Sequence, residues 1–563
     1  MDSVDVRMVN LPIMARPWGW VTPWTVLTVG LAALVMTPVV FVLFSLATPA
    51  VAVWQHLVTT VLKDYVLNTL GLAVGVGLGV LLLGTGTAWL VTMCHFPGRR
   101  VLTWALLLPL AAPAYVLAYT YTDFLEVGGP FQGWLRGTFG WQVGDYWFPP
   151  IRSLGGAIVL LTLTLYPYVY MAGRVAFREQ SHQVTEVSRS LGCSPWQSFW
   201  RVALPLARPS LAAGLALALM ETLNDYGTVQ FFGVNTLTTG IYRTWHGLGD
   251  RVAATQLAAL TLVGIAGLLW WEQGSRRRRR YFQTFAAKTA YSRYRLTGIP
   301  AVLSVVGCGL PVLAGFILPA GILMRLATED WQATVTARFW GFALNSLYLA
   351  LLAAAIIVVL ALLLSYGQRQ TPIGIPGRIV RAAAQIAGLG YGIPGTVIAV
   401  GILVPLGWLD NTIDAAMVRL TGQGTGLLLS GTVVALQFAY VVRFLAVALS
   451  TLSASLSKIH PHLDEAARSL GHSLGKTLWR VHLPLLWPGV VTAALLVFVD
   501  VMKELPATLI IRPFNLETLA VRAFQMASDE RLAEAMAPSL AIVVVGLLPV
   551  LLLNWQLQRA EGD

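Results

Sequence analysis

Long apolar runs alternate with short polar loops along almost the whole chain. Twelve of these runs reach the length needed to cross a bilayer, which is about 20 helical residues. They lie at about 24–46, 66–93, 101–122, 153–175, 207–232, 251–271, 299–324, 341–366, 379–406, 424–450, 486–510 and 536–555. Because lipid offers the backbone no hydrogen-bond partners, each run is predicted to be an α-helix. The pattern predicts an all-α integral membrane protein with about 12 transmembrane helices in two sets of six.

The two sets of six runs are related by an internal repeat. Asn68-Thr69-Leu70 reappears as Asn345-Ser346-Leu347, and Pro97-Gly98-Arg99 reappears as Pro376-Gly377-Arg378. Six is an even number, so both halves enter the membrane from the same side and the repeats are parallel rather than inverted. The predicted units are a first half, a basic linker and a second half, at residues 1–272, 273–298 and 299–563.

Composition supports the membrane assignment and excludes several other classes. The chain has 563 residues, of which 56% are hydrophobic and 11% charged, and its mean hydropathy is +0.69. A soluble protein could not bury that much apolar surface. The three cysteines have no close spacing, which argues against a disulfide framework or a thiolate metal site. The first apolar run is too long for the hydrophobic region of a signal peptide, so we expect it to be retained as a span.

The positive charge gives the orientation of the spans. The net charge of +12 could suggest a nucleic-acid partner. However, 26 of the 38 Lys and Arg residues fall in segments on the same side as the two termini, among them five in a loop counted from Arg443 to Arg480, which predicts that both termini are cytoplasmic. The linker carries five consecutive arginines at 276–280. We interpret this run as a juxtamembrane patch that meets anionic lipid headgroups, and we expect no nucleic-acid binding.

One polar loop occurs twice at a constant spacing. Residues 186–209 match residues 465–488 at 13 of 24 positions, with an offset of 279 residues. In each copy a glutamate suits the first turn of a short helix, a glycine allows a sharp turn, and a Leu-Pro pair suits the start of the next membrane helix. The pattern predicts two short helices joined by a tight bend at the membrane face. The alternative is an amphipathic surface helix that has no partner, which duplication at a constant register disfavours.

The loop resembles a motif of the permease subunits of bacterial ABC importers: E-A-A, three residues, G, nine residues, an aliphatic residue, one residue, L-P. The second copy carries it at Glu465, Ala466, Ala467, Gly471, Leu483 and Pro484, with Arg468 inside it. The first copy carries it at Glu186, Gly192, Leu204 and Pro205, with Arg189 inside it and Val187-Ser188 in place of the alanines. The resemblance implies that each loop is a coupling helix that docks on an ABC ATPase, of which two copies bind. ATP and Mg²⁺ would be bound by that partner.

A narrower resemblance follows each loop. Residues 220–228, 238–245, 500–508 and 512–515 are similar to the fused permeases of bacterial ferric-iron importers. This implies a bacterial inner-membrane protein that receives ferric iron from an extracytoplasmic ferric-ion-binding protein and moves it by alternating access. Two alternatives stay open. The cargo could be thiamine, phosphonate, a polyamine or sulfate, or the chain could be an ion-driven secondary carrier.

Four carboxylates lie within predicted spans. Glu221 and Asp225 are four residues apart, which would place them on one face of the fifth span, and Asp500 and Glu504 are their counterparts on the eleventh. Each costs about 2.5–3.5 kcal/mol to insert into lipid, so we expect them to face a cavity or a partner. If the two halves pack about a pseudo-twofold axis, the four could line one translocation path. Hard oxygen ligands suit Fe(III), but the sequence identifies no metal-ligand set.

The alternative for these carboxylates is structural. Lys503 could neutralise Asp500 three residues before it or the adjacent Glu504, and the remaining carboxylates could cap helix breaks near Gly227 and Pro506. A transit path must also release its cargo, which argues against a tight binding site. The sequence therefore leaves the translocation and capping hypotheses open.

Two glycine-rich stretches resemble nucleotide-binding motifs. Residues 471–477 have three residues between the glycines, where a phosphate-binding loop needs four. Residues 390–395 match G-x-G-x-x-G but lie in mid-membrane around Pro394, where close helix packing or a kink explains them better. We therefore expect this chain to bind no nucleotide or other cofactor and to catalyse no reaction.

Overall fold

The computed structural model describes residues 23–179, 188, 190, 192, 194–277, 293–329, 335–371 and 374–562. The predicted docking residues Glu186 and Arg189 and most of the basic linker lie outside this part of the chain. Within it, 11 helices are long and apolar enough to cross a membrane, and a bent pair of helices brings the number to 12. The all-α integral membrane class predicted from the apolar runs is confirmed.

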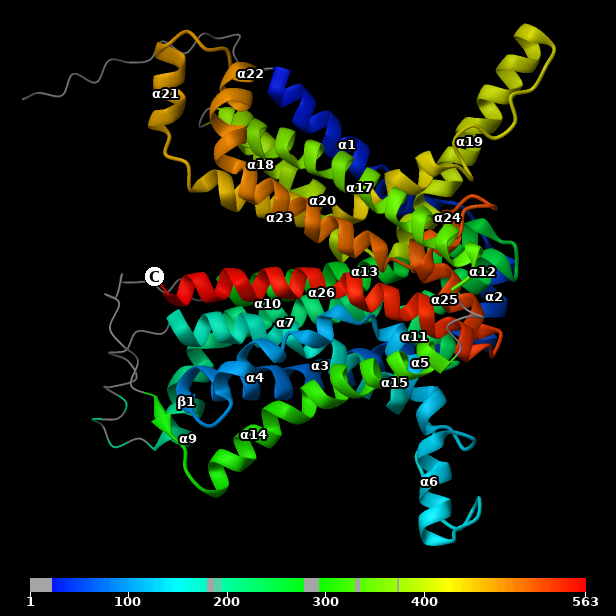
Figure 1. Ribbon diagram of the computed structural model, residues 1–563. Coiled ribbons are helices and arrows are strands. Elements are labelled where there is room, and N and C mark those ends of the chain that lie inside the picture. The colour runs from blue at the N-terminus through cyan, green and yellow to red at the C-terminus, as the bar shows by residue number, and fades with distance from the viewer. Residues whose placement is uncertain are drawn as a thin grey trace, which may run out of the picture.

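The first half runs from α1 to α13 (Figure 1). Its elements are α1 (Pro23–Phe44), η1 (Ser45–Ala47), α2 (Val51–Thr60), α3 (Leu62–Met93), β1 (Cys94–His95), α4 (Arg99–Ala105), η2 (Leu108–Ala111), α5 (Ala114–Leu125), α6 (Pro130–Phe139), α7 (Leu154–Glu179), α9 (Pro195–Ser198), η3 (Phe199–Ala203), α10 (Leu204–Asn224), α11 (Gly227–Phe231), α12 (Leu237–His246) and α13 (Arg251–Arg277).

The second half repeats this order after a short strand. Its elements are β2 (Tyr294–Arg295), α14 (Ile299–Val312), η4 (Leu313–Ile317), α15 (Leu318–Glu329), α17 (Ala337–Gln370), α18 (Ile375–Ala387), η5 (Gly388–Gly392), α19 (Gly395–Thr421), α20 (Val433–Ser457), α21 (His462–Ser469), α22 (Leu474–Thr477), η6 (Leu478–His482), α23 (Leu483–Met502), α24 (Pro506–Ile511), α25 (Leu519–Ser528) and α26 (Leu532–Gly562).

The third span of each half is broken, and the prediction of one continuous helix there was wrong. In the first half, the segment Arg99–Ala111 meets Ala114–Phe139 at a bend of 91°. In the second half, α18 passes through a 3₁₀ turn, η5, before α19 begins. The residue before the proline is extended at both breaks, with ψ of 119° at Ala112 and 127° at Ile393. Proline disfavours a helical conformation in the residue that precedes it, which explains why both spans break at the same place.

The Leu-Pro pairs lie inside continuous helices rather than at helix starts, which corrects the predicted role of Pro205 and Pro484. Helical segments run without interruption over Trp196–Asn224 and Leu474–Met502. Just before each Leu-Pro pair, the helix contains one π turn, η3 or η6. Proline cannot donate the usual helix hydrogen bond and its ring crowds the preceding turn, so a widened turn there lets the helix continue.

The halves exchange their first spans. Helix α1 packs on α17, α18 and α19 of the second half, whereas α14 and η4 pack on α3, α4 and α7 of the first half. Helix α15 packs on α5 of the first half and on α26 of its own half. A parallel pairing of β1 with β2 holds the end of the linker against the first half, where the Leu296 amide donates to the His95 carbonyl at 3.0 Å. Each packed bundle is therefore completed by a helix from the other sequence half.

The glycines of residues 390–395 serve close packing, as the sequence suggested. The 3₁₀ turn η5 lies against α20, and a Cβ added at Gly390 would overlap the Val442 carbonyl. A Cβ added at Gly395 would collide with Arg443 and with the amide of Ala507. These contacts bring the broken third span of the second half against the centre of the molecule.

Candidate functional site

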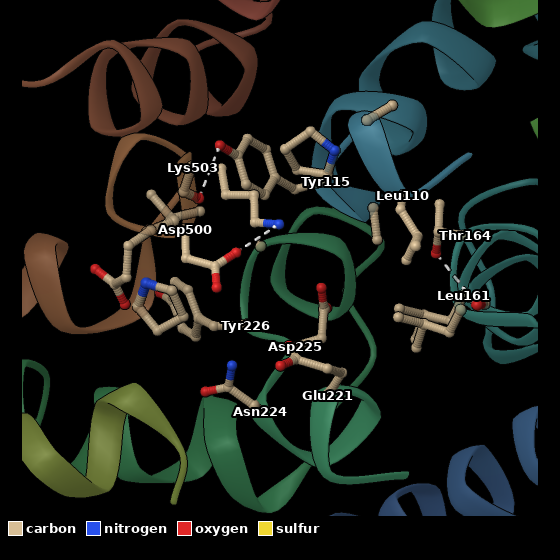
Figure 2. Close-up of a pocket in the computed structure, with 18 of the residues that line it drawn as sticks. Leu110, Tyr115, Leu161, Thr164, Glu221, Asn224, Asp225, Tyr226, Asp500 and Lys503 are labelled. Carbon is tan, nitrogen blue, oxygen red and sulfur yellow. Dashed lines mark hydrogen bonds and ion pairs between the residues drawn. The ribbon is translucent and has the colours of Figure 1, made fainter. Parts of the chain in front are cut away.

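A cavity of about 130 Å³ lies between the two halves, where α10 and α23 end. It is lined by the five charged residues predicted to lie in spans, which are Glu221, Asp225, Asp500, Lys503 and Glu504. Figure 2 shows Glu221 and Asp225 on one side of this cavity and Asp500 and Lys503 on the other. The structure therefore brings together, around one space, residues that lie 279 positions apart in the sequence.

The sequence analysis placed all four carboxylates on helical faces, which is correct for Glu221 and Asp500 and wrong for Asp225 and Glu504. Glu221 and Asp500 lie near the ends of α10 and α23, but these helices end at Asn224 and Met502. Asp225 and Glu504 therefore lie beyond the helix ends, in the breaks that precede α11 and α24.

Asp225 and Glu504 cap the helices that follow each break. Asp225 accepts from the backbone amides of Thr228 and Val229, both at 3.1 Å, and from the Thr228 hydroxyl at 3.0 Å. Glu504 accepts from the amides of Ala507 and Thr508, both at 2.9 Å, and from the Thr508 hydroxyl. The first amides of a helix have no partner within it, and at bilayer depth these carboxylates replace water as acceptors. The capping alternative describes these two residues.

Asp500 and Glu221 lie at equivalent positions but have different surroundings. Asp500 forms an ion pair with Lys503, with 2.9 Å between Oδ1 and Nζ. The side chains are partly accessible, 18% for Asp500 and 31% for Lys503. The Lys503 carbonyl accepts from the Tyr115 hydroxyl at 3.3 Å. Among the residues that the structure describes, none donates a hydrogen bond to the half-buried Glu221 carboxylate or forms an ion pair with it.

Arg443 was misplaced by the sequence analysis, which counted it among the basic residues of a cytoplasmic loop. It lies within α20 and lines the cavity. Its Nη1 donates to Glu504 Oε1 at 3.3 Å and to Asn224 Oδ1 at 3.0 Å. The same Asn224 oxygen accepts from the Gly395 amide at 2.8 Å. Arg443 thus joins the end of α10 in the first half to the centre of the second half.

The cavity is acidic but is not a preformed metal site. It has two carboxylates from each half, whereas both basic residues come from the second half. In the described part of the chain, no three His, Cys, Asp or Glu side chains lie close enough to hold a metal ion. A cation in this conformation would meet separated carboxylates and the ammonium of Lys503.

The second copy of the duplicated loop has the predicted shape. Helix α21 is followed by Gly471 with φ of +76° and then by the short helix α22. A Cβ added at Gly471 would meet nothing within 4 Å, so the left-handed backbone rather than crowding requires glycine there. Of the predicted docking residues on α21, Glu465, Ala466 and Arg468 are exposed and Ala467 is buried. We call residues 462–482 the second elbow.

Asp464 fixes the second elbow to the membrane helices, a role that the sequence analysis missed. Its carboxylate accepts from Arg369 Nε of α17 at 2.8 Å and from Nε2 of the fully buried His482 at 2.7 Å. Burial by itself would raise the pKa of Asp464, but the hydrogen bonds from Arg369 and His482 outweigh it and lower that pKa below its ordinary value. The sequence analysis missed this role because the two partners of Asp464 lie 95 and 18 residues away along the chain, and no sequence motif links residues at these distances.

The first elbow, residues 188–203 as far as they are described, has the same backbone turn but different packing. Gly192 has φ of +78°. The ring of Phe199 lies 5.0 Å from Trp89 of α3 and 5.9 Å from Trp196, measured between centroids. Both elbows lie at the same end of the helix bundle, where α9 and α21 are labelled in Figure 1. This is the arrangement expected of parallel repeats.

Comparisons with known proteins match this architecture. The sequence model of the family described as "Binding-protein-dependent transport system inner membrane component" matches residues 75–281 and 375–561, one match in each half. These ranges include both elbows and both cavity walls.

Curated relatives carry several substrate names. The Fe(3+)-transport system permease protein FbpB 2 of Haemophilus influenzae is 25% identical over 497 residues, which are 86% of this chain and 88% of the relative. The ferric transport system permease protein FbpB of Actinobacillus pleuropneumoniae is 23% identical over 80% of this chain and 64% of its own length. The sulfate transport system permease protein CysT of Escherichia coli is 32% identical over 26% of this chain and 50% of its own length.

Proposed function

Because this chain belongs to the binding-protein-dependent transport system inner membrane component family, we propose that it is the permease of an ATP-driven importer that carries ferric iron into the bacterial cytoplasm. An extracytoplasmic binding protein delivers the iron to one end of the helix bundle. Two copies of an ABC ATPase dock on the elbows at the other end, which faces the cytoplasm. The chain itself is a transport subunit, and the ATPase hydrolyses ATP.

The observation that carries the ferric proposal is the placement of Glu221 and Asp500, the two carboxylates that do not cap a helix, on opposite walls of one cavity between the halves. Carboxylate oxygens are hard ligands that suit a hard cation. The comparisons support the same cargo. The two relatives that align over 86% and 80% of this chain are both named for ferric iron.

The continuous helices supply the mechanical connection. One helix runs from the second elbow at Leu474 to Met502, just past Asp500, and its counterpart runs from Trp196 to Asn224. A helix of 29 residues is about 43 Å long. When the ATPases close, they draw the elbows together, and each helix carries that movement to its cavity wall. Alternating access follows as a rigid-body rotation of the two bundles about the cavity.

A second cargo class has its own support. Lys503 and Arg443 line the cavity, and the relatives include permeases named for sulfate and for 2-aminoethylphosphonate. An oxyanion would be attracted to these basic groups. Family membership favours both importer proposals over an ion-driven secondary carrier.

Reconstitution tests the cargo directly. The permease is placed in proteoliposomes with its ATPase, and uptake of radioactive iron from the loaded binding protein is compared with uptake of radioactive sulfate. We expect ATP-dependent iron uptake, which E221Q and D500N reduce without changing co-purification of the ATPase. Sulfate uptake without iron uptake would replace the ferric proposal with the oxyanion one. Wild-type iron uptake by both variants would remove the two carboxylates from the path.

A further inference from the structure

We propose that Lys503 is a tethered counter-ion, whose ammonium occupies the cation position beside Asp500 until the cargo displaces it. Lys503 would thereby set how weakly the cavity holds a cation. The inference rests on the proposed cation cargo and deepens it. It assigns to Lys503 a role opposite to that of an anion-binding residue.

The two cavity walls differ at this position. Glu221 and Asp500 occupy equivalent positions in the repeat, but Asn224 stands where the second half has Lys503. The first wall therefore has a carboxylate without a basic neighbour on its own helix. The second wall carries its own cation, 2.9 Å from the equivalent carboxylate. In effect, the second wall already holds a cation, and this cation is part of the chain.

The two basic residues of the cavity also differ in how firmly they are held. The Arg443 side chain is 7% exposed and bonds to both Glu504 and Asn224, so it is part of the packed core. The Lys503 side chain is 31% exposed, and within the described part of the chain Asp500 is its one acidic ion-pair partner. A lysine ammonium on its flexible four-carbon stem can leave one carboxylate without disturbing the backbone. Lys503 is therefore the basic residue that a cargo cation could displace.

Displacement explains how an acidic cavity can release a highly charged cation. A transit site must bind its cargo strongly enough to admit it and weakly enough to let it leave. A cation that binds Asp500 must first break the Asp500–Lys503 ion pair, so the lost ion pair weakens its binding. When the cation leaves, the ammonium returns to the carboxylate and the site closes behind it.

A terbium titration of the whole complex tests this role. Tb³⁺ is a hard trivalent ion whose luminescence reports binding, and it is added to the purified full-length permease bound to its ATPase. We expect K503M to bind Tb³⁺ about tenfold more tightly than the wild type, because the competing charge is gone. The charge-preserving K503R should restore the wild-type affinity. K63M, at an exposed lysine near the start of α3, is the matched control and should leave the affinity unchanged.

The double variant D500N/K503M checks that the gain arises at Asp500. If Lys503 competes for that carboxylate, the tighter Tb³⁺ binding of K503M should disappear when Asp500 is neutralised. Unchanged or weaker Tb³⁺ binding by K503M would overturn the counter-ion role, and so would a gain that survives D500N.

Uptake measurements separate this inference from the proposed cargo. Lower ferric uptake by K503M together with tighter Tb³⁺ binding would support both. If the wild-type complex transports no iron but K503M still binds Tb³⁺ more tightly than the wild type, the ferric cargo is refuted and the counter-ion role is supported. Weaker sulfate binding by K503M with unchanged Tb³⁺ binding would show that Lys503 contacts an anion, and would overturn the inference.

Discussion

The two elbows have the same backbone turn, but their described contacts with the membrane helices differ. In the second elbow, Asp464 accepts hydrogen bonds from Arg369 and His482. In the first elbow, Phe199 packs against aromatic rings, and the position equivalent to His482 is Ala203. Among the residues that the structure describes, the second elbow is therefore joined to the membrane helices by a polar network and the first by ring packing.

The two cavity walls, like the two elbows, share a backbone arrangement but differ in their side chains. Both halves break the helix after the repeat-equivalent carboxylates and cap the next helix with Asp225 or Glu504. However, Arg443 of the second half corresponds to Thr164 of the first, whose hydroxyl bonds to carbonyls of its own helix. The repeat thus duplicates turns and breaks, while the charged groups that act across the cavity belong mainly to one half.

The largest expected effect is at Arg443. Replacing it in R443M leaves the buried Glu504 without its ion-pair partner and removes the contact to Asn224. Breaking a buried ion pair in this way costs about 3–5 kcal/mol. The equivalent T164V change should cost less than about 1 kcal/mol, since it removes a local hydrogen bond. The free energy of unfolding in mixed micelles measures both variants, and equal costs would contradict the asymmetry of the walls.

The next effect in size is at Asp464. D464N weakens two hydrogen bonds to a charged acceptor and should cost about 2 kcal/mol of unfolding free energy. It should also reduce co-purification of the ATPase, because α21 loses its attachment to α17 and to the π turn η6. The exposed neighbour Glu465 gives the matched stability control, and E465Q should leave the unfolding free energy unchanged. If D464N is as stable as E465Q, the polar network does not hold the elbow.

The pH dependence of the same elbow has a defined sign. Burial raises the pKa of Asp464, but the hydrogen bonds and charges of Arg369 and His482 outweigh burial, so this pKa is lowered in the folded protein. The stabilisation is therefore fully present above the ordinary aspartate pKa and is lost as the pH falls through the lowered pKa. Unfolding of the wild type, measured as the pH falls from 6 to below the ordinary aspartate pKa, should show this loss, and D464N should lack it.

Much of the fold could be predicted because lipid restricts the backbone to helices, so apolar length alone locates the spans. The repeat offset also identified the two elbows and the residues that face the cavity. The broken third spans could not be predicted from apolar length, because the breaks are set by Pro113 and Pro394 and by packing against the other half. The exchange of α1 and α14 leaves no local signal, since any apolar helix can pack on either half.

The candidate site was predicted in its members but not in their roles. Asp225 and Glu504 were assigned to helical faces because an i, i+4 spacing is typical of a helix, and the helix ends intervene. Arg443 was grouped with loop residues because the count of basic residues ignored its place within an apolar run. Its position ten residues into the apolar α20 was the signal that could have identified it.

A smaller and equal effect is expected at the two elbow glycines. Gly192 and Gly471 have φ of +78° and +76°, and an added Cβ meets nothing within 4 Å at either. G192A and G471A should each cost about 1 kcal/mol of unfolding free energy, from the left-handed backbone alone. G475A lies in α22, where φ is not positive and space is open, and should cost nothing. Unequal costs for the two elbow variants would mean that the shared turn is not equally important in both.

The smallest effect distinguishes ring packing from simple burial in the first elbow. F199L introduces the residue that the repeat places at the equivalent position 478. It keeps an apolar side chain but removes the ring contacts with Trp89 and Trp196, which contribute about 0.5 kcal/mol because Trp196 is largely exposed. We expect F199L to lower the unfolding free energy by that amount. It should also reduce co-purification of the ATPase, but by less than D464N does. If F199L has no effect, the ring contacts of Phe199 do not stabilise the first elbow, and the contrast drawn from the described contacts no longer stands.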